Sequence, residues 1–352
     1  MVRLLRGPLL LTAGALVAGC DLVVLKPAGD VAVQQGQLIV YSTVLMLIVI
    51  LPVMALTLFF AFHYRASNKS ATYSPDWDHS ISLEIVVWSV PLAIIICLAG
   101  LTWVATHRLE PYNDLRRVSE TQAIDPDVEP LTIQVVALDW KWLFIYPEQG
   151  IATVNEVAAI VDRPVEFKLT SATVMNSFYI PALAGQIYAM AGMETELNAV
   201  INEGGDYRGF SANYSGTGFS QMRFRFLGMQ AGEFDAWVDE VRASTTSLDR
   251  NSYTALASPS IGDAAAYFSG IEDGLWRRIL NLCTEPGSLC MDDMMMVDAL
   301  GGGGVAGLYR RHMYADICAA EDAPSLYRMI RQELNPLQTV ADGSAASTSD
   351  RP

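Results

Sequence analysis

The stretch LIVYSTVLMLIVILPVMALTLFFAF, from Leu38 to Phe62, contains no charged residue. At a rise of about 1.5 Å per residue, a helix of this length exceeds the roughly 30 Å hydrocarbon core of a bilayer. A second uncharged stretch, IVVWSVPLAIIICLAGLTWVAT, runs from Ile85 to Thr106. Pro52 and Pro91 lie inside these stretches, which membrane helices tolerate because neighbouring groups satisfy the freed carbonyl. We therefore expect a transmembrane helical hairpin over residues 38–106.

The composition agrees with a membrane protein. The chain has 352 residues, of which 51% are hydrophobic and only 17% are charged. Its formal net charge of −15 argues against nucleic acid as a partner, because phosphate binding needs clustered lysine and arginine. The length is sufficient for two or three compact units.

The first twenty residues, MVRLLRGPLLLTAGALVAGC, combine a basic start, a short apolar run and small residues before a cysteine. This pattern predicts a secretion signal over residues 1–19, which is too short to span a bilayer. The ending LVAGC resembles the bacterial lipobox, whose cysteine becomes the lipidated first residue. We expect a lipidated segment over residues 20–37 that begins at Cys20. An ordinary cleaved signal with an incidental cysteine is the alternative.

The distribution of basic residues does not settle the orientation of the hairpin, since the connecting loop carries Arg65 and Lys69 and three arginines follow the second span. The export signal gives the orientation instead, because a lipidated Cys20 must lie outside. The loop is then cytoplasmic, and everything after Thr106 is periplasmic. We expect a multi-pass protein of the bacterial inner membrane whose N-terminus and large C-terminal domain are both periplasmic.

Strand patterns dominate the first half of the outer part. Residues 107–130 are polar and acidic and predict a linker. Alternation then begins, with LTIQV at 131–135, VEFKL at 165–169 and MRFRF at 222–226. A period of two with one apolar face predicts half-buried strands. Because glycine and proline mark the turns between them, residues 131–230 are expected to form a small β-sandwich or barrel.

The pattern changes after the sandwich. Helical spacing predicts a helical C-terminal region over residues 231–335, and residues 336–352 read as a disordered tail. Cys283 and Cys290 could close a short loop and leave Cys318 unpaired, but connectivity cannot be read from sequence. The cluster CMDDMMM at 290–296, with His312 and Met313, could bind copper(I), although a Met-rich helix face is the commoner explanation.

The loop GFSANYSGTGFSQM, from Gly209 to Met222, has the spacing of a metal-binding loop without its ligands. The chain resembles subunit II of the haem-copper respiratory oxidases along nearly its whole length. In the cytochrome c oxidase branch the loop reads Cys-x3-Cys-x3-His-x2-Met, with a further histidine in an upstream His-Ser-Phe-x-x-Pro stretch and a glutamate between the cysteines. The corresponding positions here are Asn176, Ser211, Asn213, Ser215, Phe219 and Met222.

These residue types predict that the chain binds no metal. A dinuclear copper centre needs two bridging thiolates, whereas a serine hydroxyl is not ionised at neutral pH and phenylalanine offers no lone pair. Met222 alone would not retain copper. The stretches ALDWKWLFIYPEQGIATVNE, MNSFYIP and QIYAMAGM resemble the quinol-oxidising branch of the family, the cytochrome bo type, whose electron donor is a membrane-dissolved quinol.

The resemblance implies a fold and a function. The fold is a membrane protein of the α+β class, with a two-helix hairpin, a periplasmic cupredoxin-like sandwich without copper and a helical extension. The function is that of subunit II of a proton-pumping ubiquinol oxidase that reduces dioxygen to water. Haems and copper are expected in subunit I, with subunits III and IV and membrane lipid as further partners. This chain is then a structural subunit without a redox centre.

Three residues outside the loop carry further expectations. In the resembling family a glutamate at the position of Glu84 marks the entrance of a proton pathway into subunit I, while the alternative is a carboxylate that stabilises the positive end of a helix. Trp140 and Trp142 match the family's aromatic stretch beside the copper centre. Without copper we interpret them as core and interface aromatics.

Two other functions remain open. A degenerate cytochrome c oxidase subunit would keep an acidic face for a basic cytochrome, but the missing ligands would leave no route for electrons. A stand-alone membrane lipoprotein with a binding or structural role would need no partner subunit.

Overall fold

The computed structural model describes residues 23–72, 74, 76–115, 117–286, 288, 290–292 and 294–295. The expected signal, Cys20, the disordered tail, Cys318 and His312 lie outside these residues. So does most of the C-terminal half of the expected helical region.

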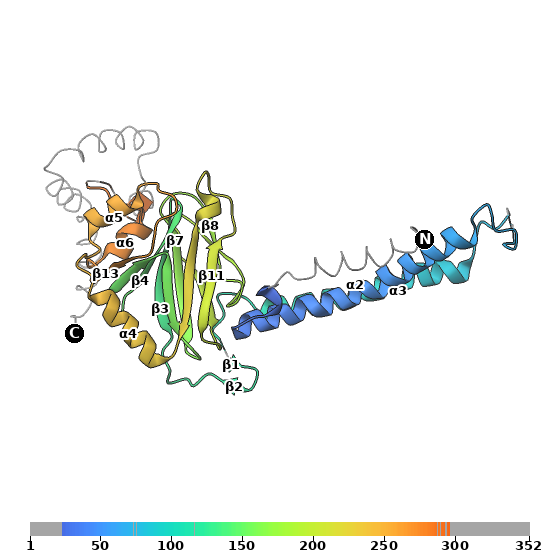
Figure 1. Cartoon of the computed structure of the whole chain (residues 1–352), viewed down its shortest axis with the longest axis horizontal. Helices are drawn as coiled ribbons and strands as arrows, with labels where there is room; N and C mark the ends of the chain where they lie inside the picture. The colour runs from blue at the N-terminus through green and yellow to red at the C-terminus, as the bar shows by residue number, and fades with distance from the viewer. Residues whose placement is uncertain are drawn as a thin grey trace, which may run out of the picture.

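Two long helices form the predicted hairpin, α2 (Asp30–His63) and α3 (Ile81–Arg108), preceded by the short helix η1 (Val23–Leu25). Both are long and apolar enough to cross a membrane. Figure 1 shows them running side by side away from the rest of the molecule. Both are longer than the sequence suggested. In particular, α2 begins at Asp30 rather than Leu38, so the expected separate segment over 20–37 ends earlier than predicted.

The early start of α2 has a structural cause. The amides of Ala28 and Gly29 both donate to the carbonyl of Ala182, at 2.9 and 3.0 Å, and Gly29 forms a β-bridge with Ile201. A Cβ at Gly29 would lie 2.5 Å from the carbonyl oxygen of Val200, so only glycine fits this close approach. The first turn of α2 is thus seated inside the base of the outer domain.

Two packed sheets form the outer domain (Figure 1). The six-stranded sheet has the order β10-β7-β3-β4-β5-β13, and the five-stranded sheet has the order β6-β12-β11-β8-β9. Both are mixed, since β3 pairs in parallel with β7 and β6 with β12. The strands are β3 (Leu131–Leu138), β4 (Lys141–Tyr146), β5 (Ile151–Val154), β6 (Glu156–Ile160), β7 (Pro164–Ser171), β8 (Asn176–Tyr179), β9 (Ile187–Ala189), β10 (Thr195–Val200), β11 (Gly205–Ser211), β12 (Arg223–Met229) and β13 (Ala266–Phe268).

The space between the sheets is the main hydrophobic core. It contains large side chains from both layers, among them Phe144 and Phe167 from the six-stranded sheet and Phe178 and Phe226 from the five-stranded sheet. The rings of Phe178 and Phe224 stack with centroids 5.2 Å apart. The predicted sandwich is therefore confirmed.

The C-terminal extension differs from the prediction. Besides the helices α4 (Ala231–Arg242), α5 (Arg250–Ala257) and α6 (Leu275–Leu280), it contributes strand β13, which pairs with β5 at the sheet edge. A second hydrophobic core forms between this extension and the outer side of the six-stranded sheet, with Leu143 and Ile145 facing Tyr253 and Ile279. The described part of the expected helical region thus contains three helices and, in addition, one short strand that the sequence did not predict.

The expected linker also contains structure. Strands β1 (Arg117–Ser119) and β2 (Gln122–Ala123) form a small hairpin within residues 107–130. The Arg117 Nε donates to the buried Asp30 carboxylate at 2.8 Å, and Gln34 donates to the same oxygen at 2.8 Å. This segment therefore fixes the end of α2 to the domain instead of passing freely between them.

Candidate functional site

The six positions of the metal-type frame come together at one end of the sandwich. Asn176 opens β8, Ser211 closes β11, and Met222 directly precedes β12. Phe219 begins the short helix η2 (Phe219–Gln221) in the loop between them. Asn176, Ser211 and Met222 are buried, with exposures of 1%, 2% and 0%.

The polar side chains of this cluster form hydrogen bonds with one another and with nearby backbone carbonyls. The Ser211 hydroxyl donates to the Asn176 Oδ1 at 3.0 Å and lies 3.2 Å from the carbonyl of Asn213. The Asn176 amide donates to the carbonyl of Val174, and the Asn213 amide donates to that of Met175, both at 3.1 Å. Each polar group thus has a partner, which removes the cost of burying it.

The donor set does not fit a dinuclear copper centre. The Ser215 Oγ lies 4.0 Å from the Met222 sulfur, and the Phe219 ring packs on Tyr214 with centroids 5.7 Å apart. Neutral hydroxyls and amides with a single thioether provide neither thiolate nor imidazole. Within the described residues, no group of three or more His, Cys, Asp or Glu side chains could hold a metal ion.

The two tryptophans of the aromatic stretch have different surroundings. Trp140 has a φ of 71°, rare for a side chain of this size, and its indole Nε1 donates to the carbonyl of Ser215 at 3.0 Å. A Cβ at Gly218 would lie 2.5 Å from this ring, so the loop lies flat against it. Trp142 is fully buried, and its ring meets Phe178 and Phe224 edge to face. Trp140 supports the loop, and Trp142 belongs to the core.

Glu84 lies in the first turn of α3, where the sequence placed it. Its Oε1 is 2.7 Å from the Nδ1 of His79, and both side chains are 56% exposed. Sequence reasoning missed this histidine. Its position just before the helix, on the same end of the hairpin as Glu84, was the available signal.

Sequence reasoning also missed a buried carboxylate at the junction of the sandwich and the extension. Glu156 is 3% exposed and accepts hydrogen bonds from Arg225 Nη1 at 2.9 Å, Trp237 Nε1 at 3.1 Å and the Tyr267 hydroxyl at 2.6 Å. Burial and the bond to Glu156 raise the pKa of Tyr267. The signal was a glutamate within the apolar stretch NEVAAI.

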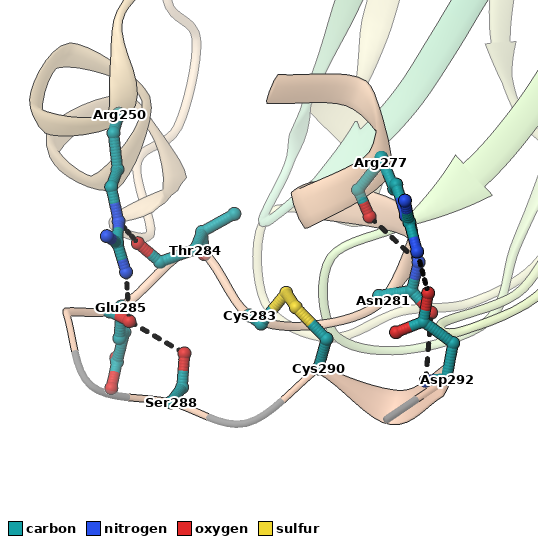
Figure 2. Close-up of a disulfide and its surroundings, with 9 residues drawn as sticks. All are labelled: Arg250, Arg277, Asn281, Cys283, Thr284, Glu285, Ser288, Cys290 and Asp292. Atoms are coloured by element: carbon teal, nitrogen blue, oxygen red, sulfur yellow. Dashed lines mark hydrogen bonds and ion pairs between the residues drawn. A yellow bond between two sulfur atoms is a disulfide. The ribbon is translucent and has the colours of Figure 1, made fainter. Parts of the chain in front are cut away.

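Near the end of the part of the extension that the structure describes, Cys283 and Cys290 form a disulfide, a pairing that the sequence left open. Figure 2 shows the bridge beside the Arg250 guanidinium, which donates to the carbonyls of Thr284 and Glu285. On its other side, Arg277 and Asp292 form an ion pair at 2.7 Å. These contacts attach the end of the described extension to α5 and α6.

Comparison with known proteins gives consistent matches. The family model described as the COX aromatic rich motif matches residues 242–287. The chain is 51% identical over 254 residues to the cytochrome bo(3) ubiquinol oxidase subunit 2 of Pseudomonas putida, covering 72% of this chain and 78% of that protein. It is 49% identical over 270 residues to the ubiquinol oxidase subunit 2 of Acetobacter aceti, covering 77% and 85%.

A solved structure is also similar. The periplasmic domain of subunit II of cytochrome oxidase from Bradyrhizobium japonicum aligns with a TM-score of 0.31 and 22% identity, covering 33% of this chain and 96% of that one.

Proposed function

Since the chain belongs to the family of ubiquinol oxidase subunits 2, we propose that it serves its oxidase as a structural subunit that carries no electrons. The complex is a terminal oxidase of the respiratory chain. In our proposal ubiquinol delivers electrons directly to subunit I, which holds the haems and copper, and subunits III and IV complete the assembly.

One observation supports a copper-free role above all. The Ser211 hydroxyl and the Asn176 amide, at positions where copper ligands would stand, bind each other at 3.0 Å in the buried interior. Together with the loop resting on Trp140, this cluster keeps the end of the sandwich rigid without a metal. A rigid end of this kind is suited to packing against a partner subunit.

Glu84 is proposed as the entrance of a proton pathway into subunit I. The Glu84 carboxylate lies in the first turn of α3, at the start of the second span, and its Oε1 is 2.7 Å from the His79 Nδ1, so the two side chains offer adjacent groups along which a proton could pass. Glu84→Gln should lower quinol-driven turnover severalfold while the complex still assembles. Asp76→Asn, in the same connecting loop, is the matched control and should leave turnover unchanged. If Glu84→Gln turned over at the same rate as the wild type, Glu84 would not be the entrance of the proton pathway.

The membrane attachment is proposed to include a lipid on Cys20 after cleavage of residues 1–19, with the N-terminus and the outer domain both in the periplasm. The LVAGC ending supports this. Labelling cells with a radioactive fatty acid should mark the wild-type chain and not the Cys20→Ser variant. Label on both would mean that the attachment lies elsewhere.

The electron donor is tested on the whole complex. We would isolate it through a tag on this chain and compare oxygen uptake with ubiquinol and with reduced cytochrome c. Turnover with ubiquinol only is expected. Turnover with cytochrome c would mean that an electron route through this chain exists, and a haem-free preparation without oxygen uptake would indicate a stand-alone lipoprotein.

A further inference from the structure

The first residue of β4, Lys141, is a buried lysine, with only 4% of its side chain exposed. A lysine at this depth is stable only when its charge and its three N–H donors have partners. The Lys141 Nζ donates to the carbonyl of Ser258 at 3.0 Å and to the hydroxyl of Ser260, and it lies 3.1 Å from the Asp263 carboxylate. All three acceptors come from residues 258–263, which we call the brace loop.

The ion pair joins two separate parts of the fold. The brace loop belongs to the C-terminal extension, where it follows α5 and precedes β13, whereas Lys141 belongs to the sandwich. Asp263 is 35% exposed, so water can reach its carboxylate, but water does not reach the lysine in the same way. Removal of Asp263 therefore leaves an unpaired buried charge, which is more costly than removal of Lys141.

The brace loop also holds the β3–β4 turn, which carries Trp140. The Ser260 amide donates to the carbonyl of Asp139 at 3.2 Å, directly before this tryptophan. The Trp140 indole in turn donates to the carbonyl of Ser215, in the β11–β12 loop, at 3.0 Å. The extension is thus connected to the β11–β12 loop through the β3–β4 turn.

Two further contacts connect the brace loop to the same end of the sandwich. A Cβ at Gly262 would lie 2.9 Å from the Oε1 of Gln221, so the brace loop and the β11–β12 loop also approach each other directly. The Asn155 side-chain amide donates to the backbone carbonyl of Asp263 at 2.9 Å, and its Oδ1 accepts from the amide of Trp142 at 2.9 Å. The brace loop is therefore attached at several points around the end of the sandwich.

We propose that the brace loop fixes the β11–β12 loop in place and supplies the crosslinking that a bound metal could otherwise give. Metal–ligand bonds stabilise a folded site because residues from different segments share one ion. Here contacts from the extension connect the β3–β4 turn, Asn155 and the β11–β12 loop instead. This inference rests on the proposed role of the chain as a structural subunit, in which a fixed end of the sandwich meets subunit I.

Hydrogen–deuterium exchange of the purified complex, followed by mass spectrometry, tests the proposal. The amides of Phe219, Gln221 and Met222 are hydrogen-bonded within the β11–β12 loop, so their exchange rate reports how often this loop opens. Asp263→Ala should raise that rate about tenfold, and Lys141→Met about threefold. The double variant should exchange no faster than Asp263→Ala alone, because the two side chains act as one pair.

The matched control is Lys168→Met. It breaks an ion pair with Glu166 at 3.5 Å on β7 of the same six-stranded sheet, and it should leave the exchange of the β11–β12 loop unchanged. Strand β10 is the internal reference in every variant, and its exchange should not change.

Unchanged exchange of the β11–β12 loop in Asp263→Ala would overturn the proposal. An equal rise in β10 would also overturn it, since the whole domain would then have lost stability. If Asp263→Ala does not assemble, Asp263→Asn, which retains one acceptor oxygen, should give a rise of about threefold in its place. Oxygen uptake with reduced cytochrome c by the wild-type complex would contradict the structural role without altering the exchange result, so the two ideas can fail separately.

Discussion

The two sheets of the outer domain are built from similar strands but differ in how many faces they bury. The six-stranded sheet has a core on each side, one shared with the other sheet and one shared with the C-terminal extension, so every residue of β4 is buried. The five-stranded sheet has a core on one side only, and β12 alternates between exposed and buried residues over its first half. The extension thus stabilises one sheet and leaves the other free to meet a partner.

The largest effect is expected where the two sheets and the extension meet. Glu156→Ala should lower the free energy of unfolding by about 4 kcal/mol, because the buried Trp237 and the partly buried Tyr267 lose their acceptor and Arg225 loses one of its two carboxylates. Denaturant unfolding of the purified complex, followed by tryptophan fluorescence, measures it. Asp239→Ala, an exposed acid on α4, is the control and should cost about 0.5 kcal/mol or less. Equal losses would mean that Glu156 does not join the layers.

The same substitution in each sheet tests the comparison directly. Leu143→Ala, in the second core, should cost about 3 kcal/mol. Leu227→Ala, on β12, should cost about 1 kcal/mol because that side chain is only partly buried and lies at the margin of the main core. Similar losses would mean that the outer face of the five-stranded sheet is covered in the complex.

Reduction of the disulfide should loosen the extension and spare the sandwich. Cys283→Ser removes a crosslink across a sequence separation of 7, which is worth about 2 kcal/mol. Limited proteolysis should then cut faster near residues 281–292. Cys97→Ser, which alters a free thiol in α3, should have no such effect. Unchanged proteolysis of Cys283→Ser would mean that the Arg250 and Arg277 contacts suffice.

The smallest effect is expected at high pH, where one buried tyrosine in each core contributes to a fall in stability. Burial raises the pKa of Tyr146 in the main core and of Tyr253 in the second core. Above pH 10 the unfolded chain loses these protons and the folded chain keeps them, so stability falls by about 1.4 kcal/mol per pH unit for each group. Tyr253→Phe should remove the contribution of one of these two groups to the fall in stability with pH.

Tyr146→Phe is the matched variant for the main core. It should likewise remove one group's contribution to the fall in unfolding free energy with pH above pH 10. It should also lower stability at neutral pH, since the Tyr146 hydroxyl donates to the carbonyl of Ala158 and accepts from its amide. An unchanged slope in both variants would contradict the assignment.

Sequence reasoning found what depends on local pattern. The uncharged stretches gave the hairpin, and alternation gave β3, β7 and β12, since each has at least one face that reads as polar. Sequence reasoning did not identify β4 as a strand, because both its faces are buried and its sequence shows no alternation of apolar and polar residues. β13 has only three residues, too few for a period to show, and was absorbed into a region expected to be helical.

The candidate site divides in the same way. The spacing of Asn176, Ser211 and Met222 was enough to bring them together, because the family frame fixes their places on β8 and the β11–β12 loop. The partners of Glu156 could not be found, since Trp237 and Tyr267 are distant in sequence and reach it only after the extension folds over the sheet. A single sequence carries no record of such contacts.

The seat of α2 also bears on biogenesis. Ala28 and Gly29 leave the ribosome early, but the carbonyl of Ala182 and the β-bridge partner Ile201 that receive them are made far later and must first cross the membrane. The hairpin is therefore inserted before the part of the outer domain that holds its first turn has been synthesised. Docking of the first turn of α2 is therefore a late step of maturation. It can be completed only after the outer domain has folded and its residues Ala182 and Ile201 can contact Ala28 and Gly29.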